Sequence, residues 1–188
     1  MSDISKLKDF DRITSILFPF SGMGKIDPFI LKNASDRGIR VHCICDCIIL
    51  QLPTDQIDSS HQGYVESFKK WKEGKKFLIK PERFYDDELQ ITGEIDGIYE
   101  KDGEVTLFDL KTSASEGKTW NLQGSAYAYL ARKSGFKIDR VEFIKLCKKG
   151  TAAKVYIYDE DMNSFLMCLS VYRKFFKNSK EEVDLDYM

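Results

Sequence analysis

Apolar residues recur at helical spacing in four stretches of the chain, with polar residues at the intervening positions. The longest stretch begins at Asp27-Pro28, where an acidic cap precedes a proline at the first helical position. The pattern predicts helices over residues 27–50, 60–73, 119–133 and 160–177. Residues 1–26 carry one short apolar piece, at 13–20, and we expect this segment to be mostly irregular.

Shorter runs of apolar residues predict strands over residues 77–86, 89–100, 104–112, 139–148 and 152–158. Asp102-Gly103 lies between the second and third runs, and this dipeptide favours a tight turn between two antiparallel strands. The order of these elements predicts an α/β fold, in which one mixed central sheet is flanked by helices on both faces. We expect the acidic tail, residues 178–188, to be frayed.

Length and composition are those of an ordinary globular chain. With 188 residues, 43% of them hydrophobic and 31% charged, we expect a single domain spanning residues 1–188. The net charge of −1 provides no overall positive field toward nucleic acid, so contact with DNA would have to use a local group of basic residues. No stretch approaches the roughly 20 apolar residues that a membrane span needs.

Five cysteines are present, without a CxxC pair, and no apolar secretory stretch occurs at the amino end. These features favour a reduced, intracellular setting. Cys43, Cys45 and Cys47 alternate within the first predicted helix, where they point in different directions and cannot bind one metal together. We interpret them as small core residues.

Three charged residues on the predicted hairpin form the strongest candidate site. The strand period of two places Asp109 and Lys111 on one face of their strand, about 7 Å apart. Asp96 lies on the preceding strand, and we expect the hairpin to bring it beside them. Two facing carboxylates repel each other, and a hard cation such as Mg²⁺ or Mn²⁺ removes that repulsion. These three residues could therefore hold a divalent cation beside a phosphodiester bond, and water could then cleave that bond.

Two predicted helices carry candidate residues four positions apart, which places them on one face. In the first helix, Gly38 and His42 form such a pair. His42 either reaches a metal or a phosphate, or is satisfied within the core by Asp46. In the third helix, Gln123 and Tyr127 either bind a phosphate oxygen and support the neighbouring lysine, or occupy ordinary boundary positions.

Further candidates are less specific. Glu82 is either an additional carboxylate for the metal or a surface ion-pair partner of Arg83. Tyr64, Phe68 and Trp71 could stack on unpaired bases, but their helical spacing favours core packing. The lysines on and after the second predicted helix either contact DNA or simply form a solvent-exposed helix face, and both explanations fit the pattern equally well. The basic residues that could contact DNA phosphates are Arg37, Arg40, Lys69, Lys70, Lys72, Lys75 and Lys76.

Four motifs follow one another with the order and spacing of one nuclease family. They are Gly38-x-x-x-His42, Gly93-x-x-Asp96, Asp109-x-Lys111-Thr112 and Gln123-x-x-x-Tyr127. On these motifs, the sequence resembles the RecB-like branch of the PD-(D/E)XK nuclease superfamily, and within it the exonucleases of phages and of mitochondrial genome maintenance. The resemblance covers about residues 30–130.

The resemblance implies a metal-dependent DNA nuclease with a restriction-endonuclease-like core. Asp96, Asp109 and the backbone carbonyl of Leu110 would bind Mg²⁺ or Mn²⁺, and His42 would lie at or near the metal. Lys111 would be the catalytic lysine, and the supporting motif would consist of Gln123 and Tyr127. Some relatives hold an iron–sulfur cluster through cysteines that this chain lacks, so no cluster is expected.

The resemblance also implies DNA as the substrate, either as single strands or as duplex ends. We expect a role in replication, recombination or repair, in the cytoplasm of a bacterium or a phage-infected host cell, without association with a membrane. The sequence leaves open whether a helicase or recombinase partner delivers the substrate. The motifs do not determine the oligomeric state. The alternative is a non-catalytic module that uses a nuclease fold to bind DNA or protein. Asp96, Asp109 and Lys111 are all intact, which favours the enzyme.

Overall fold

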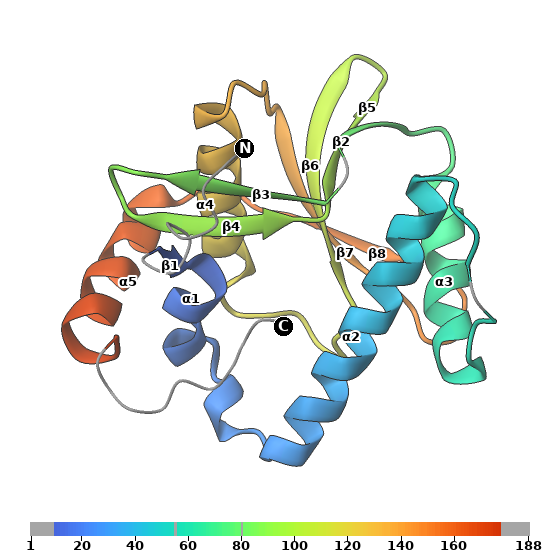
Figure 1. Ribbon diagram of the computed structural model, residues 1–188, viewed down its shortest axis with the longest axis horizontal. Coiled ribbons are helices and arrows are strands. Elements are labelled where there is room, and N and C mark those ends of the chain that lie inside the picture. The colour runs from blue at the N-terminus through green and yellow to red at the C-terminus, as the bar shows by residue number, and fades with distance from the viewer. Residues whose placement is uncertain (1–9, 55, 80, 178–188) are drawn as a thin grey trace.

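After a short first strand, the chain forms a group of helices, then five consecutive strands, and then a helix, two strands and a last helix (Figure 1). The computed structural model describes residues 10–54, 56–79 and 81–177, so the tail predicted to fray, residues 178–188, lies outside them. The helices are α1 (Ile13–Ser21), the 3₁₀ helix η2 (Met23–Lys25), α2 (Pro28–Ile49), α3 (Ser59–Lys72), α4 (Trp120–Lys133) and α5 (Met162–Phe175). The strands are β1 (Asp11–Arg12), β2 (Lys76–Ile79), β3 (Glu82–Asp86), β4 (Ile91–Ile95), β5 (Gly97–Lys101), β6 (Glu104–Lys111), β7 (Arg140–Lys145) and β8 (Lys154–Ile157).

Within the described residues, the strands form two hydrogen-bonded sheets. The larger sheet has the order β2-β5-β6-β7-β8, and the smaller sheet has the order β1-β4-β3. β6 and β7 are parallel and connected through α4, whereas β5 and β6 are antiparallel. The prediction of a mixed α/β fold with helices on both sides is confirmed, but the single sheet that we expected is divided in two.

The division occurs within two of the predicted strands. The predicted strand 89–100 ends at Ile95 and begins again at Gly97, so that β4 belongs to the smaller sheet and β5 to the larger one. The predicted strand 77–86 is divided in the same way, into β2 and β3. The chain therefore passes between the two sheets at Asp96, where it bends.

Gly97 makes this passage between the sheets sterically possible. A Cβ atom at this position would lie 2.6 Å from the carbonyl oxygen of Ile79 and 2.8 Å from the ring of Phe108. Both neighbours belong to strands of the larger sheet, so a side chain at residue 97 would push β5 out of its place. The apolar pattern of the sequence does not contain this constraint, because it arises from residues far from Gly97 along the chain.

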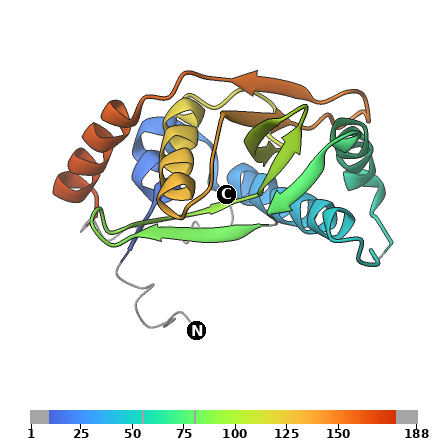
Figure 2. The ribbon, with the colours of Figure 1, turned by 90° about the horizontal axis from the view of Figure 1, so that it is seen from above.

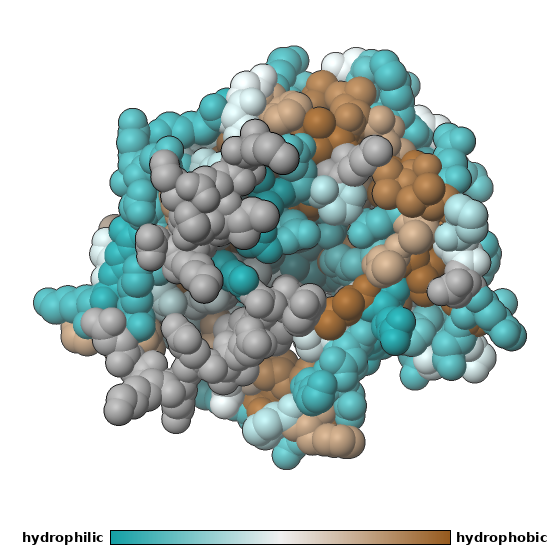
Figure 3. Space-filling view, viewed as in Figure 1, coloured by the Kyte–Doolittle hydropathy of each residue, from teal (hydrophilic) through white to brown (hydrophobic). Residues whose placement is uncertain are grey.

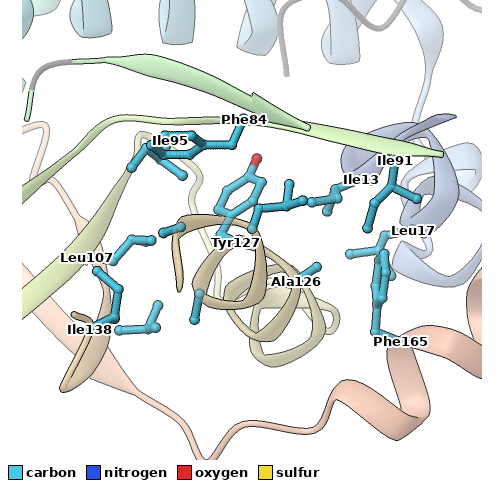
Figure 4. Packing of buried hydrophobic residues seen from close by; sticks show 14 of the residues in the cluster. Ile13, Leu17, Phe84, Ile91, Ile95, Leu107, Ala126, Tyr127, Ile138 and Phe165 are labelled. Atoms are coloured by element: carbon cyan, nitrogen blue, oxygen red, sulfur yellow. The ribbon is translucent and has the colours of Figure 1, made fainter. Parts of the chain in front are cut away.

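Two hydrophobic cores pack against opposite sides of β6. Leu107 belongs to the first core, which includes residues of α1, α4 and α5. Phe108 and Leu110 belong to the second, which includes residues of α2 and α3. Figures 1 and 2 show these two groups of helices on either side of the strand. Figure 4 shows Tyr127 of α4 within the first core, reaching toward Phe84 on β3. Among the described residues, no helix is both long and apolar enough to cross a membrane.

Several local predictions are confirmed. Asp27 caps α2, because its side chain accepts hydrogen bonds from the backbone N–H groups of Phe29 and Ile30 at 2.9 and 3.2 Å. Asp102 and Gly103 have positive φ angles of 54° and 83°, as the tight turn between β5 and β6 requires. Three aromatic residues of α3 lie in the second core, as their spacing favoured: Tyr64, Phe68 and Trp71.

Two predictions are wrong. The segment that we expected to be irregular contains α1, whose residues Ile13 and Leu17 are buried in the first core. Pro19 lies inside this short helix and obscures its pattern, because proline normally disfavours a helix interior. Of the cysteines interpreted as core residues, Cys45 is buried, but Cys43 is exposed to solvent.

Gly93 and Gly38 allow a test of this packing with matched substitutions. A Cβ atom at residue 93 would lie 2.7 Å from Cε1 of Tyr127, whereas one at residue 38 would lie 3.7 Å from Oγ1 of Thr112. Gly93→Ala should therefore lower the free energy of unfolding by about 1–3 kcal/mol. Gly38→Ala should leave it unchanged or raise it by up to about 1 kcal/mol, because alanine favours a helix interior. Urea unfolding measures both, and equal losses would contradict this packing.

Candidate active site

The bend between β4 and β5 places the carboxylate of Asp96 beside β6. Its Oδ2 atom accepts a hydrogen bond from the backbone N–H of Leu110 at 2.5 Å. Its Oδ1 atom lies 2.9 Å from Nδ1 of His42, which α2 provides from the other side. Glu94, two residues earlier, remains exposed and pairs with Arg83 at 2.5 Å. Strand alternation alone would place Asp96 on the same face as Glu94, and the bend separates the two.

Asp109 and Lys111 point from β6 toward α4, as the strand period predicted. The Lys111 Nζ atom lies 2.8 Å from Oδ2 of Asp109 and donates a hydrogen bond to Oε1 of Gln123 at 3.2 Å. The amide nitrogen of Gln123 donates to Oδ1 of Asp109 at 3.4 Å and lies 2.9 Å from the hydroxyl oxygen of Tyr127. In the predicted supporting motif on α4, Gln123 therefore contacts both Asp109 and Lys111, and Tyr127 contacts Gln123.

The close packing of these groups shifts the pKa of each acid and base. Burial raises the pKa of Asp109 to about 6, although the adjacent Lys111 ammonium opposes this change. Burial acts in the same direction on Asp96, but His42 and the Leu110 N–H hold the pKa of Asp96 below its usual value. Burial lowers the pKa of His42, but the Asp96 carboxylate outweighs it and raises this pKa to about 9. In the metal-free protein, His42 is therefore an imidazolium paired with Asp96 at neutral pH.

The donor set suits a hard divalent cation. Two carboxylates converge from neighbouring strands, and hard cations prefer carboxylate and carbonyl oxygen. The Oδ2 atom of Asp109 is buried and accepts no well-aligned hydrogen bond from any described residue, although Lys111 Nζ lies close to it. Among the described residues, no group of three or more His, Cys, Asp or Glu side chains is arranged as a metal site. Ligands beyond Asp96 and Asp109 would therefore include backbone oxygens, such as that of Leu110, or water.

Asp46 is a further acidic residue near this cluster. His42 contacts Asp96 rather than Asp46, so the alternative in which Asp46 satisfies the histidine is wrong. The Oδ1 atom of Asp46 is buried and has no hydrogen-bond partner among the described residues. Burial, together with the charge of Asp96, raises the pKa of Asp46 to about 7. In the sequence, only the position of Asp46, four residues after His42 on α2, indicated that Asp46 lies near the cluster.

Other predicted residues form no hydrogen bond or ion pair with Asp96 or Asp109 in the part of the chain that the structure describes. Glu82 lies opposite Ile95, the neighbour of Asp96, in the pairing of β3 with β4. Glu82 is exposed at the start of β3, and Arg83 pairs with Glu94 instead of with Glu82. Lys69 pairs with Glu66 on α3 at 2.8 Å, and Lys72 lies in the last turn of the same helix.

Arg37 of α2, in contrast, reaches the end of β6. It donates a hydrogen bond to the carbonyl oxygen of Thr112 at 3.3 Å, and Thr112 directly follows Lys111. Arg37 and Arg40 also line a cleft between α2 and α3, together with Lys148, which the sequence patterns had not indicated. The Lys148 side chain comes from the loop after β7, so only the tertiary structure brings it to the two arginines.

Comparisons with known proteins identify a family. A family model described as the PD-(D/E)XK nuclease superfamily matches residues 34–182. The structure is similar to that of a candidate exonuclease from Eubacterium rectale, with a TM-score of 0.51 and 14% sequence identity over 91% of this chain and 80% of that chain. It is also similar to a protein named SSO0001, with a TM-score of 0.43 and 12% identity over 90% of this chain and 82% of that chain. No curated protein matches the sequence significantly.

The ion pair between His42 and Asp96 should make the stability of the metal-free protein depend on pH. The folded pKa of His42, about 9, lies above its unfolded value of 6.5, so the contribution is complete below pH 6.5 and is lost as the pH rises through 9. A double-mutant cycle with His42→Gln and Asp96→Asn, measured by urea unfolding in EDTA, should give a coupling of about 1–3 kcal/mol at pH 6.5. The coupling should be largely lost at about pH 10. A coupling that is equal at both pH values would contradict the ion pair.

Proposed function

The chain belongs to the PD-(D/E)XK nuclease superfamily, and we propose that it hydrolyses phosphodiester bonds of DNA with Mg²⁺ or Mn²⁺. The observation that carries this proposal is the meeting of Asp96, from the bend between β4 and β5, with Asp109 and Lys111 of β6. We further propose that the protein is an exonuclease, acting at DNA ends or in single strands. The fold shared with the candidate exonuclease from Eubacterium rectale supports this choice.

Asp96, Asp109 and the backbone carbonyl of Leu110 would hold the cation, with His42 beside it. A bound divalent cation lowers the pKa of a coordinated water and neutralises charge on the phosphate. The Asp109 carboxylate is held in place by the Gln123 amide at 3.4 Å. His42 restrains Asp96 from the opposite side, at 2.9 Å. Both carboxylates are therefore positioned before a substrate binds.

Lys111 would stabilise the negative charge that develops on the phosphate during cleavage. Its Nζ atom is anchored by Oε1 of Gln123 at 3.2 Å. It lies 5.5 Å from the centroid of the Phe143 ring and 6.0 Å from that of Trp120, so aromatic groups limit its movement. The nearby Tyr127 hydroxyl holds Gln123 through a 2.9 Å contact. Gln123 and Tyr127 thus act as positioning residues for the lysine.

We place this activity in DNA replication, recombination or repair, in the cytoplasm of a bacterium or a phage-infected host. A helicase or recombinase would supply the DNA ends or single strands. Residues 1–188 would act as one nuclease domain. Family membership supports DNA as the substrate.

Digestion of labelled DNA tests the proposed function. With Mg²⁺ or Mn²⁺, the protein should degrade linear DNA and leave circular DNA of the same sequence intact. EDTA should abolish the reaction, because the carboxylates alone cannot activate water. Cleavage of circles at the same rate would make the protein an endonuclease. Failure to cleave any DNA with either metal would favour the non-catalytic binding module.

Lys111→Ala should abolish this cleavage while leaving metal binding and DNA binding largely intact. Removing its ammonium takes away charge stabilisation in the transition state, for which a loss of about 10²–10³ in rate is typical. Single-turnover digestion and fluorescence anisotropy measure the two properties separately. Lys174→Ala, at an exposed position of α5, is the matched control and should cleave normally. If Lys111→Ala cleaves as fast as the parent protein, the assigned role is wrong.

Mn²⁺ should raise the melting temperature of the parent protein. At a concentration 100 times the dissociation constant, the stabilisation should be about 2.7 kcal/mol. Asp109→Asn should remove this increase, because an amide lacks the negative charge that attracts the cation. Asp87→Asn changes an exposed carboxylate in the turn between β3 and β4 and should retain the increase. A full increase in Asp109→Asn would place the cation elsewhere.

A further inference from the structure

A polar cleft of about 350 Å³ lies between α2 and α3, apart from Asp96 and Asp109. Its lining residues all carry charged or polar side chains. In Figure 3, hydrophilic residues cover much of the face seen in Figure 1. The residues that matter most for its chemistry are Asp36, Arg37, Arg40, Ser60, His61 and Lys148.

The charges of this cleft favour an anion. Arg37, Arg40 and Lys148 provide three positive charges, against the single carboxylate of Asp36. That carboxylate is already paired with Lys32, one turn earlier on α2, at 3.1 Å. Neither Arg40 nor Lys148 forms an ion pair with another residue in the described part of the chain. The cleft therefore keeps an uncompensated positive charge.

Lys148 is held at the cleft by close packing between its loop and α3. A Cβ atom at Gly63 would lie 1.8 Å from the carbonyl oxygen of Lys148, so only glycine at this position of α3 lets the loop approach. The backbone N–H of Cys147 donates a hydrogen bond to Oγ of Ser67 at 3.0 Å. Both interactions fix the loop backbone beside α3, and Lys148 reaches the cleft from a fixed position.

Arg37 connects the cleft to the proposed catalytic strand. Its Nη2 atom donates to the carbonyl oxygen of Thr112, and its guanidinium carbon lies 5.8 Å from the centroid of the Tyr64 ring. Its Nε atom is buried and has no hydrogen-bond partner among the described residues. A buried donor without an acceptor is unfavourable, so an anion that supplies an oxygen would be favoured here.

We propose that this cleft binds a phosphate group of the DNA strand other than the phosphate being cleaved. The inference rests on the proposed function and adds a second binding point for the substrate. Arg40 and Lys148 contribute charge, the His61 imidazole and the Ser60 hydroxyl contribute hydrogen bonds, and Arg37 ties the subsite to the end of β6. Because phosphates are the same in every sequence, this interaction positions the strand without selecting bases. The phosphate is either internal to the strand or at its end.

Binding of a fluorescent single-stranded oligonucleotide in EDTA tests the subsite without any cleavage. The double variant Arg40→Ala, Lys148→Ala should bind at least about tenfold more weakly than the parent protein. Its plot of log affinity against log salt should be shallower by about 0.7 for each phosphate that the variant no longer neutralises. The control Lys154→Ala, Lys174→Ala removes the same charge from β8 and α5 and should match the parent protein. Thermal melting of both variants verifies that they are folded.

Three forms of the oligonucleotide distinguish the source of the phosphate: a linear strand with a 5′-phosphate, a linear strand with a 3′-phosphate and a circular strand. A defect limited to one phosphorylated end assigns the cleft to a terminal phosphate, whereas a defect that includes the circle assigns it to an internal one.

Equal affinity and equal salt dependence of the cleft variant and the parent protein for every form would overturn the inference. If the parent protein cleaves DNA in that case, the nuclease proposal stands. If the cleft binds DNA but no cleavage occurs, only the nuclease proposal fails.

Discussion

The passage of the chain from one sheet to the other at Asp96 determines the geometry of the candidate site. β4 pairs with β1 and β3, whereas β5 pairs with β2 and β6, so the backbone must bend between them. Gly97 permits this bend, because Ile79 and Phe108 leave no room for a side chain. The bend directs the Asp96 carboxylate to the backbone of β6 and to His42 on α2. Without the change of sheets, Asp96 would continue the face of Glu94, which is exposed.

The site lies where the two hydrophobic cores meet at the end of β6. One core supports α4, which carries Gln123 and Tyr127, and the other supports α2, which carries His42. Burying Asp109 in this position is unfavourable, as its raised pKa shows. The packing of both cores holds Asp96, Asp109 and Lys111 together despite this cost. A protein can retain such an unfavourable arrangement where the residues are needed for chemistry, and a bound cation would offset the cost of burying the carboxylate.

Local signals in the sequence predicted much of the fold. The cap at Asp27, the turn at Gly103 and the alternation along β6 each depend on a few neighbouring residues, so they could be identified from the sequence. The order of the four motifs led to the correct superfamily. The division into two sheets and the role of Gly63 under the Lys148 loop depend on interactions between distant segments. A pattern of hydrophobic residues does not contain that information, and Pro19 weakens the local helix signal of α1.

The central claim is that Asp96 and Asp109 share one divalent cation at the end of β6. Anomalous diffraction from crystals of the protein soaked in Mn²⁺ tests it most directly. We expect one strong peak within coordination distance of both carboxylates, accompanied by displacement of the Lys111 amine from Asp109. A peak bound to only one carboxylate, or no peak at a Mn²⁺ concentration that supports DNA cleavage, would contradict the claim.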